Sequence, residues 1–179
     1  VNKSVLAEAI TIQMTWPGAP TIYYADEAGQ VGFTDPDSRR TYPWGKEDLS
    51  LIDLHRALTS LRTAYPVLKN GSLLPLSAAY GCISYARFNE QTGDVAVVAI
   101  NNTAETRTLR LPVWETGLGK DAALTEVFRS SEDGLLLSSE CCLHLENGVK
   151  HRNADAVRAE HGYLTLSLPP FCASIFVTN

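Results

Sequence analysis

The stretch Pro17-Gly-Ala-Pro-Thr-Ile-Tyr-Tyr-Ala-Asp-Glu-Ala-Gly29, followed by Gly32-Phe-Thr-Asp-Pro-Asp-Ser-Arg-Arg-Thr-Tyr-Pro-Trp44, contains the most informative residues of this sequence. Its β-branched and aromatic run Thr21–Tyr24 predicts a short buried strand. The residues from Ala25 to Asp48 are polar and rich in Gly, Asp and Pro. They predict a long loop, and long loops in compact domains are often functional.

Helical patterns flank this segment on both sides. The apolar residues between Val5 and Met14 occupy more than one side of a helix, which is typical of a largely buried helix. Leucines recur at helical spacing between Leu51 and Leu61, and Pro66 ends that helix. The run Thr21–Tyr24 is apolar on both faces and therefore needs parallel neighbours. No such neighbours are evident in the sequence, so residues 1–70 are predicted to be the last α/β unit of a barrel.

After Asn70-Gly71 the periodicity changes to short alternating runs. Turn-like stretches separate these runs, as expected for an antiparallel β-sandwich over residues 71–179. The overall prediction is a mainly β protein, with the sandwich preceded by a strand–helix unit. The polar region 142–160 is not assigned. The expected strands are Gly81–Phe88, Val95–Asn101, Thr106–Leu111, Ala123–Phe128, Leu135–Leu137, Gly162–Leu168 and Ala173–Val177.

The segment from Gly18 to Trp44 resembles the eighth-strand region of the α-amylase superfamily, family 13 of the glycoside hydrolases. The matching pattern is Gly-x-Pro-x-Ile-Tyr-Tyr, then Asp-Glu, then Gly-x-x-Asp-Pro-x-x-Arg and a Trp. The Asp-Pro-x-x-Arg part is most similar to the cyclomaltodextrinase, neopullulanase and oligo-1,6-glucosidase type. The family usually has Gly where this sequence has Ala25, so the backbone there is expected to avoid positive φ. The closing residues Leu164 to Phe176 resemble the last strands of the family's C-terminal sandwich.

This resemblance implies a retaining enzyme that acts on α-1,4- or α-1,6-glucans or maltooligosaccharides through a carboxylate nucleophile and a carboxylic acid. It also implies that residues 1–70 are helix 7, strand 8, a loop and helix 8 of a (β/α)8 barrel. The family's catalytic acids lie on the fourth, fifth and seventh strands. None of those segments is present, so the sequence is predicted to be a C-terminal fragment without catalytic residues of its own.

Asp35 and Arg39 are the predicted substrate-binding residues. By resemblance, the matching residues of cyclomaltodextrinase-type enzymes bind glucose on the non-reducing side of the cleavage point. A carboxylate accepts hydrogen bonds from vicinal hydroxyls, and a guanidinium donates in a fixed fork. The alternative is an ion pair that only ties the loop, and one pair can fill both roles. Asp37 and Arg40 are expected to be solvent-exposed loop residues.

Asp26 and Glu27 are expected to have a role in loop structure, either as acceptors of hydrogen bonds from backbone amides or at an edge of the sugar cleft, and Trp44 is a further candidate for that edge. The two carboxylates are neighbours at the end of the expected strand, so they point to opposite sides and cannot readily flank one glycosidic bond. Tyr23 and Tyr24 are expected to lie in the core, because aromatic residues of strands usually do. Trp44 follows Pro43 in the loop and remains available for stacking on a sugar ring.

Composition restricts the other classes of ligand. The net charge is -5 and no Lys/Arg-rich block occurs, so nucleic-acid binding is not expected. No apolar run reaches the length of a membrane span, and no cofactor or metal ion is expected. His144-Leu-Glu146 is only a minor metal candidate, and His55 is expected at the surface. The four cysteines have no CxxC spacing and are predicted to be buried free thiols, which favours a reducing cytoplasm.

Two alternatives to the enzyme fragment remain. A stand-alone sandwich that binds a glucan would need a platform of exposed aromatic residues, but the sandwich aromatics mostly fall in apolar alternation and are expected in the core. An inactive amylase-like ectodomain of a solute-transport subunit would need a membrane anchor elsewhere. Without further barrel strands, residues 1–45 are expected to pack on the sandwich, to pair with another copy of the chain, or to be mobile.

Overall fold

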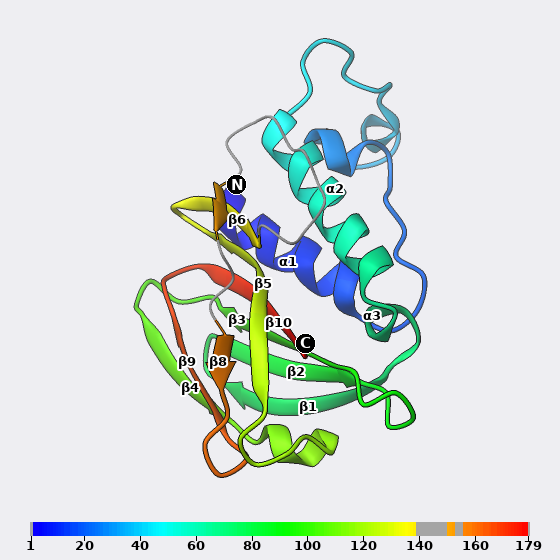
Figure 1. Cartoon of the computed structure of the whole chain (residues 1–179). Helices are drawn as coiled ribbons and strands as arrows, with labels where there is room; N and C mark the ends of the chain where they lie inside the picture. Colours follow the sequence, from blue (N-terminus) through cyan, green and yellow to red (C-terminus); the bar gives the residue numbers. More distant parts are fainter. Residues whose placement is uncertain (1, 139–149, 153–155, 179) are drawn as a thin grey trace.

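The computed structural model describes residues 2–138, 150–152 and 156–178. The first part of this range is helical and the second part consists mainly of strands (Figure 1). The helices are α1 Lys3–Thr15, η1 Asp26–Ala28, η2 Asp37–Arg39, α2 Leu49–Ala64, α3 Val67–Asn70 and, between strands, η3 Val113–Thr116. The strands are β1 Ser72–Ala79, β2 Cys82–Phe88, β3 Val95–Asn101, β4 Arg107–Leu111, β5 Ala123–Ser131, β6 Gly134–Ser138, β7 Lys150–Arg152, β8 Ala156–Arg158, β9 Leu164–Leu168 and β10 Cys172–Thr178.

The strands form two sheets. The large sheet has the order β1-β2-β3-β10-β5-β6-β7, and β8 also pairs with β5. Strands β4 and β9 form a separate antiparallel pair, with Leu109 opposite Leu166. The ladders are antiparallel except that between β6 and β7. The predicted mainly β fold with an antiparallel sandwich is confirmed.

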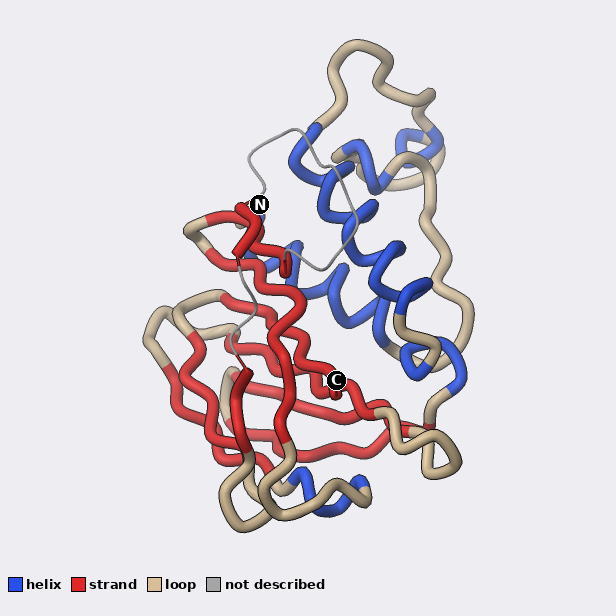
Figure 2. The backbone as a smooth tube through the Cα atoms, viewed as in Figure 1, coloured by secondary structure: helices blue, strands red, loops and turns tan. Residues whose placement is uncertain are grey.

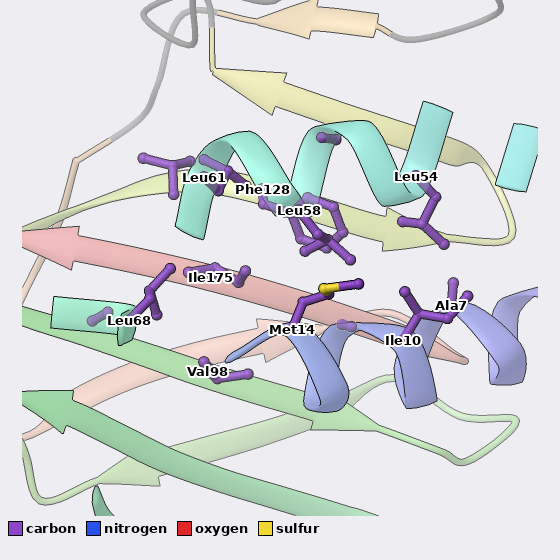
Figure 3. Packing of buried hydrophobic residues seen from close by; sticks show 14 of the residues in the cluster. Ala7, Ile10, Met14, Leu54, Leu58, Leu61, Leu68, Val98, Phe128 and Ile175 are labelled. Carbon is purple, nitrogen blue, oxygen red and sulfur yellow. The ribbon is translucent and has the colours of Figure 1, made fainter. Parts of the chain in front are cut away.

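Both faces of the large sheet are covered. On one face, Leu58 and Leu61 of α2 and Met14 of α1 approach Val98 and Ile175 of the sheet (Figure 3). On the other face, a second apolar cluster fills the space between the large sheet and the β4–β9 pair. Strand β3 is therefore buried at every residue, whereas β9, which has one solvent face, alternates between buried and exposed positions. Such burial on both faces explains why the sequence of β3 is a nearly continuous apolar run.

Capping residues define where the two long helices begin. Asn2 accepts a hydrogen bond from the Ser4 amide at 2.9 Å to begin α1. Asp48 begins α2 in the same way, with its Oδ1 accepting from the Ser50 amide at 3.2 Å. Helix α1 packs against α2, β5 and β10. Residues 1–45 were expected to pack on the sandwich, to pair with another copy of the chain, or to be mobile. Helix α1 packs on the sandwich, as the first of these expectations states.

The predicted strand Thr21–Tyr24 is wrong. These residues have no regular secondary structure, and Ile22, Tyr23 and Tyr24 are 42%, 58% and 45% exposed. A strand needs a hydrogen-bonded neighbour, and no ladder among the described residues includes this segment. The core position expected for Tyr23 and Tyr24 is wrong for the same reason.

Two further expectations about single residues are wrong. Ala25 has φ +62°, in the left-handed region, where its carbonyl accepts from the Ala28 and Gln30 amides to begin η1. His55 is 5% exposed rather than at the surface. Its Nδ1 lies 2.8 Å from the Leu51 carbonyl oxygen one turn earlier in α2.

The strand predictions agree with most of the sandwich. Each of the seven expected strands overlaps an observed one, but β1, β7 and β8 were not expected. Pro75 lies in β1, which is an edge strand, and the pairing with β2 shifts register between Pro75 and Ser77. Proline is confined to such places because it cannot donate to a ladder.

Two of the four cysteines lie in the described part of the chain. Cys82 and Cys172 are buried free thiols, as predicted, and burial raises the pKa of Cys172 to about 11. Cys141, Cys142, His144 and Glu146 lie outside the described residues. No described helix is long and apolar enough to cross a membrane.

Candidate functional site

The candidate site lies on the loop between η1 and α2, at the end of the molecule remote from the β4–β9 pair (Figure 2). The Asp48 amide donates to the Ala28 carbonyl at 2.9 Å and so closes the base of the loop. Gly29 lies against this closure, since a Cβ there would meet the Asp48 Cβ at 3.0 Å. The two ends of the loop, Ala28 and Asp48, are therefore held together at the start of α2.

Asp35 and Arg39 form an ion pair at the surface of this loop. Asp35 lies two residues before η2 and Arg39 is the last residue of η2, with Arg39 Nε 2.6 Å from Asp35 Oδ1. Their side chains are 60% and 62% exposed. A pair this exposed contributes little to stability. Both side chains are open to solvent and can exchange water for a polar ligand.

Asp37 and Arg40 hold the loop together. Arg40 Nε donates to Asp37 Oδ1 at 2.9 Å and its Nη2 donates to Oδ2 at 2.8 Å, and the Phe33 amide also donates to Oδ2 at 2.9 Å. The hydrogen bonds from Arg40, and then that from Phe33, lower the pKa of the Asp37 carboxyl. The expectation of exposure is met in part, since both side chains are roughly half exposed, but their bonding role was missed. The spacing of the two opposite charges, three residues apart, was a signal in the sequence.

Gly32 makes a close backbone approach within the loop. A Cβ at this position would lie 2.6 Å from the Ser38 Cα. The chain before η2 can therefore pass η2 only because Gly32 has no side chain. This contact, together with the Asp37 bonds to Phe33 and Arg40, fixes η2, which contains Arg39 and directly follows Asp35 and Pro36.

Asp26 and Glu27 occupy η1, apart from the ion pair. Asp26 is exposed, and Glu27 Oε2 is buried with no hydrogen-bond partner among the described residues. Asp26 lines a cavity of about 640 Å³ between α1, α2 and η1, which His55 and Leu51 also line. No hydrogen bond or ion pair between described residues joins Asp26 or Glu27 to the Asp35–Arg39 pair.

Trp44 is 80% exposed, and its ring centroid lies 4.6 Å from that of Tyr42. The structure thus leaves an aromatic face in the same loop as Asp35 and Arg39. Such a face suits the apolar side of a sugar ring, as the sequence suggested. Among the described residues, no group of His, Cys, Asp and Glu side chains is arranged to hold a metal ion.

The aromatic residues of the sandwich differ in how far they are exposed. Tyr85, Phe128 and Phe176 are buried, as expected. Tyr80 and Trp114 are 98% and 51% exposed, so their expected core position is wrong. Tyr80 lies in the turn between β1 and β2, and Trp114 lies in η3.

Comparisons with known proteins find similar sequences and structures among enzymes named as amylopullulanase, neopullulanase and α-amylase. An amylopullulanase of Thermoanaerobacter thermohydrosulfuricus is 42% identical over 102 residues, which are 52% of this chain and 7% of that protein. The neopullulanase 2 of Thermoactinomyces vulgaris is 33% identical over 118 residues, 65% of this chain and 20% of that protein. The crystal structure of an Anoxybacillus α-amylase superposes with a TM-score of 0.73 and 27% identity, covering 98% of this chain and 32% of that one. No family model matches the chain.

The chain is therefore related, in sequence and in fold, to the C-terminal region of α-amylase-family enzymes. The matches to the two relatives span only 7% and 20% of their lengths. The relatives are named for glycoside hydrolase activities, and this agrees with the resemblance of the Gly18–Trp44 segment.

Proposed function

We propose that this chain is the C-terminal portion of a retaining glycoside hydrolase acting on α-1,4- or α-1,6-linked glucans or maltooligosaccharides. The observation that carries the proposal is the similarity to an amylopullulanase at 42% identity. The exposed Asp35–Arg39 pair supports it, because it offers polar groups to a ligand on a loop held firmly at its base.

In this proposal, Asp35 and Arg39 bind sugar hydroxyls. The Asp35 carboxylate accepts from two neighbouring hydroxyls, and the Arg39 guanidinium donates to sugar oxygens. Their mutual contact at 2.6 Å aligns both groups before the sugar arrives. Trp44 contributes an apolar face, and Asp26 and Glu27 belong to the edge of the same cleft.

We further propose that the 179 residues do not hydrolyse glycosidic bonds by themselves. Retaining hydrolysis needs two carboxyl groups on either side of the bond, about 5–5.5 Å apart. Asp26 and Glu27 are neighbours on one short helix, and Asp35 and Asp37 are each paired with an arginine. The catalytic carboxylates are assigned to other parts of the complete enzyme.

The experiment has two arms. The 179-residue chain is assayed for release of reducing ends from maltooligosaccharides, and measurable hydrolysis would overturn the assignment of catalysis to other segments. In the complete enzyme, Asp35→Ala is expected to reduce the transition-state stabilisation, calculated from the ratio of kcat/KM values, by about 1–3 kcal/mol, the range for removing one partner of a hydrogen bond. The control is Asp133→Ala, an exposed residue in the turn between β5 and β6. Equal kcat/KM values for Asp35→Ala and the control would show that Asp35 only forms the ion pair with Arg39 in the loop.

A further inference from the structure

Two buried arginines meet at the end of α1. Arg62 of α2 is 8% exposed and Arg87 of β2 is 1% exposed. Among the described residues, neither guanidinium forms an ion pair with a carboxylate. Buried charges are normally paired, so the partners of these two need to be identified.

Arg62 donates to carbonyl oxygens at the end of α1. Its Nη1 donates to Met14 O at 2.8 Å and to Trp16 O at 3.3 Å, and its Nη2 donates to Gly18 O. Nη1 also lies 2.7 Å from Leu68 O in α3. One side chain of α2 therefore holds the last turn of α1, the residues that follow it, and α3.

Arg87 approaches the same point from the sandwich. Its Nη1 donates to Thr15 O at 2.7 Å and to Leu68 O at 2.8 Å, and its Nη2 donates to Gly71 O at 2.6 Å. The Leu68 carbonyl is thus shared by the two guanidiniums. A second side chain of β2 reaches the helix end as well, because the Tyr85 hydroxyl lies 2.6 Å from Thr15 Oγ1.

The end of a helix suits these groups. The last carbonyls of a helix have no intrahelical donor, and the helix dipole makes them favourable for cations. Pro17 has no N–H to offer to the turn before it. The carbonyls of Met14, Thr15 and Trp16 instead accept three hydrogen bonds from the two guanidinium groups. These carbonyl dipoles replace the missing carboxylates.

Stability alone does not explain this arrangement. Burial lowers the pKa of both guanidiniums, which reflects the cost of removing each charge from water. Apolar residues of similar volume often match or exceed the stability of buried charged groups. They cannot bond several carbonyls in fixed directions, whereas a planar guanidinium fork can. The property that the arginines add is the direction in which the chain leaves α1.

We propose that Arg62 and Arg87 are positioning residues that fix the path of the chain from α1 into the segment carrying Asp35 and Arg39. Only the description of that segment as sugar-binding rests on the proposed function. Past Gly18, the path continues to Thr21, whose carbonyl accepts from the Gln13 side chain at 2.7 Å. The sandwich, through Arg87, is thereby connected to the loop of the candidate site.

Amide hydrogen exchange of the 179-residue chain tests the positioning role. The variants are Arg87→Met and Arg62→Met, with Arg110→Met as the control, because Arg110 lies over the Tyr163 ring in the two-stranded sheet. In the two test variants, the amide hydrogens of residues 13–16 and 68–71 are expected to exchange at least about tenfold faster, while those of β3 and β10 keep their protection. The control leaves both regions unchanged. Equal acceleration throughout the chain, or none at residues 13–16, overturns the proposal.

A milder variant and a ligand titration complete the experiment. Arg87→Lys keeps the charge, but one ammonium cannot reach Thr15, Leu68 and Gly71 together, so it is expected to recover less than half of the lost protection. Maltotriose affinity, followed by NMR shifts of residues 32–44, is expected to fall at least about threefold in Arg87→Met and not in the control. Unchanged affinity beside faster exchange overturns the link to the site. If the wild-type chain binds no maltotriose, the assignment of sugar binding to the loop of residues 32–44 in this chain fails, and hydrogen exchange alone decides whether the guanidiniums hold the end of α1.

Discussion

Raising the pH from about 4.5 to about 7.5 is expected to destabilise this protein through Glu8 of α1. Glu8 is 3% exposed and lines a cavity of about 360 Å³ between α1 and the large sheet. Its Oε2 accepts from the Asn102 side chain at 2.7 Å, but its Oε1 is buried without a partner among the described residues. Burial raises the pKa of Glu8 to about 7, although the Asn102 bond opposes this rise.

The size and sign of the effect follow from the two pKa values. The unfolded chain has the ordinary value of 4.5 and the folded chain a value of about 7, so the folded state binds more protons between them. The free energy of unfolding therefore falls as the pH rises through this interval. At 1.36 kcal/mol per pH unit, the loss is about 3 kcal/mol and is nearly complete above pH 7. Cys82, in the same cavity, has a raised pKa and stays protonated throughout.

Urea denaturation at constant ionic strength across this pH range measures the effect. Glu8→Gln has no proton to lose, so its stability relative to wild type should increase by about 3 kcal/mol from the acidic to the neutral end. Glu90→Gln, an exposed change in the turn between β2 and β3, serves as the control for the loss of one carboxylate. Parallel pH profiles for wild type and Glu8→Gln would refute the reasoning.

Two further changes test the sandwich. Asn101 is fully buried, and its Nδ2 donates to Glu105 O at 2.8 Å and to Pro169 O at 2.7 Å. Asn101→Ala leaves these carbonyls unpaired and should lower the free energy of unfolding in urea by about 3 kcal/mol; a loss below about 1 kcal/mol contradicts this. Gly162 and Gly134 both have positive φ, but only at Gly162 would a Cβ meet Trp114, at 2.8 Å. Gly162→Ala is therefore expected to lower the free energy of unfolding more than Gly134→Ala does, by a difference of about 1–3 kcal/mol in urea denaturation. Equal losses would show that backbone strain alone acts.

The sequence predicted the sandwich better than the segment before it. Alternation in β9, Leu-Thr-Leu-Ser-Leu, identifies a strand with one solvent face, and the structure has that pattern. The run Thr21–Tyr24 has the composition of a buried strand, but composition cannot supply a hydrogen-bonded neighbour. Ala25 adopts positive φ because the chain turns at once into η1, and this tertiary requirement outweighs the residue's own preference.

The candidate site was predicted in part. The Asp-Pro-x-x-Arg spacing identified Asp35 and Arg39, which the structure pairs. The role of Arg87 was missed, although it had a readable signal. Arg87 lies two residues after Tyr85 in β2, so the two side chains share a face of the sheet. An arginine on the same face as a buried tyrosine must find polar partners, but the sequence could not show that these are the carbonyls of a distant helix.

In the described part of the chain, both faces of the large sheet are covered, and this limits how the chain can be shortened. Cutting after Asn70 would remove the helices that cover Val98, Phe128 and Ile175. The truncated product would expose a broad apolar surface and would be expected to aggregate at ordinary working concentrations. A soluble shortened version would need polar replacements at those three sheet positions, so anyone who isolates the sandwich must redesign one side of it.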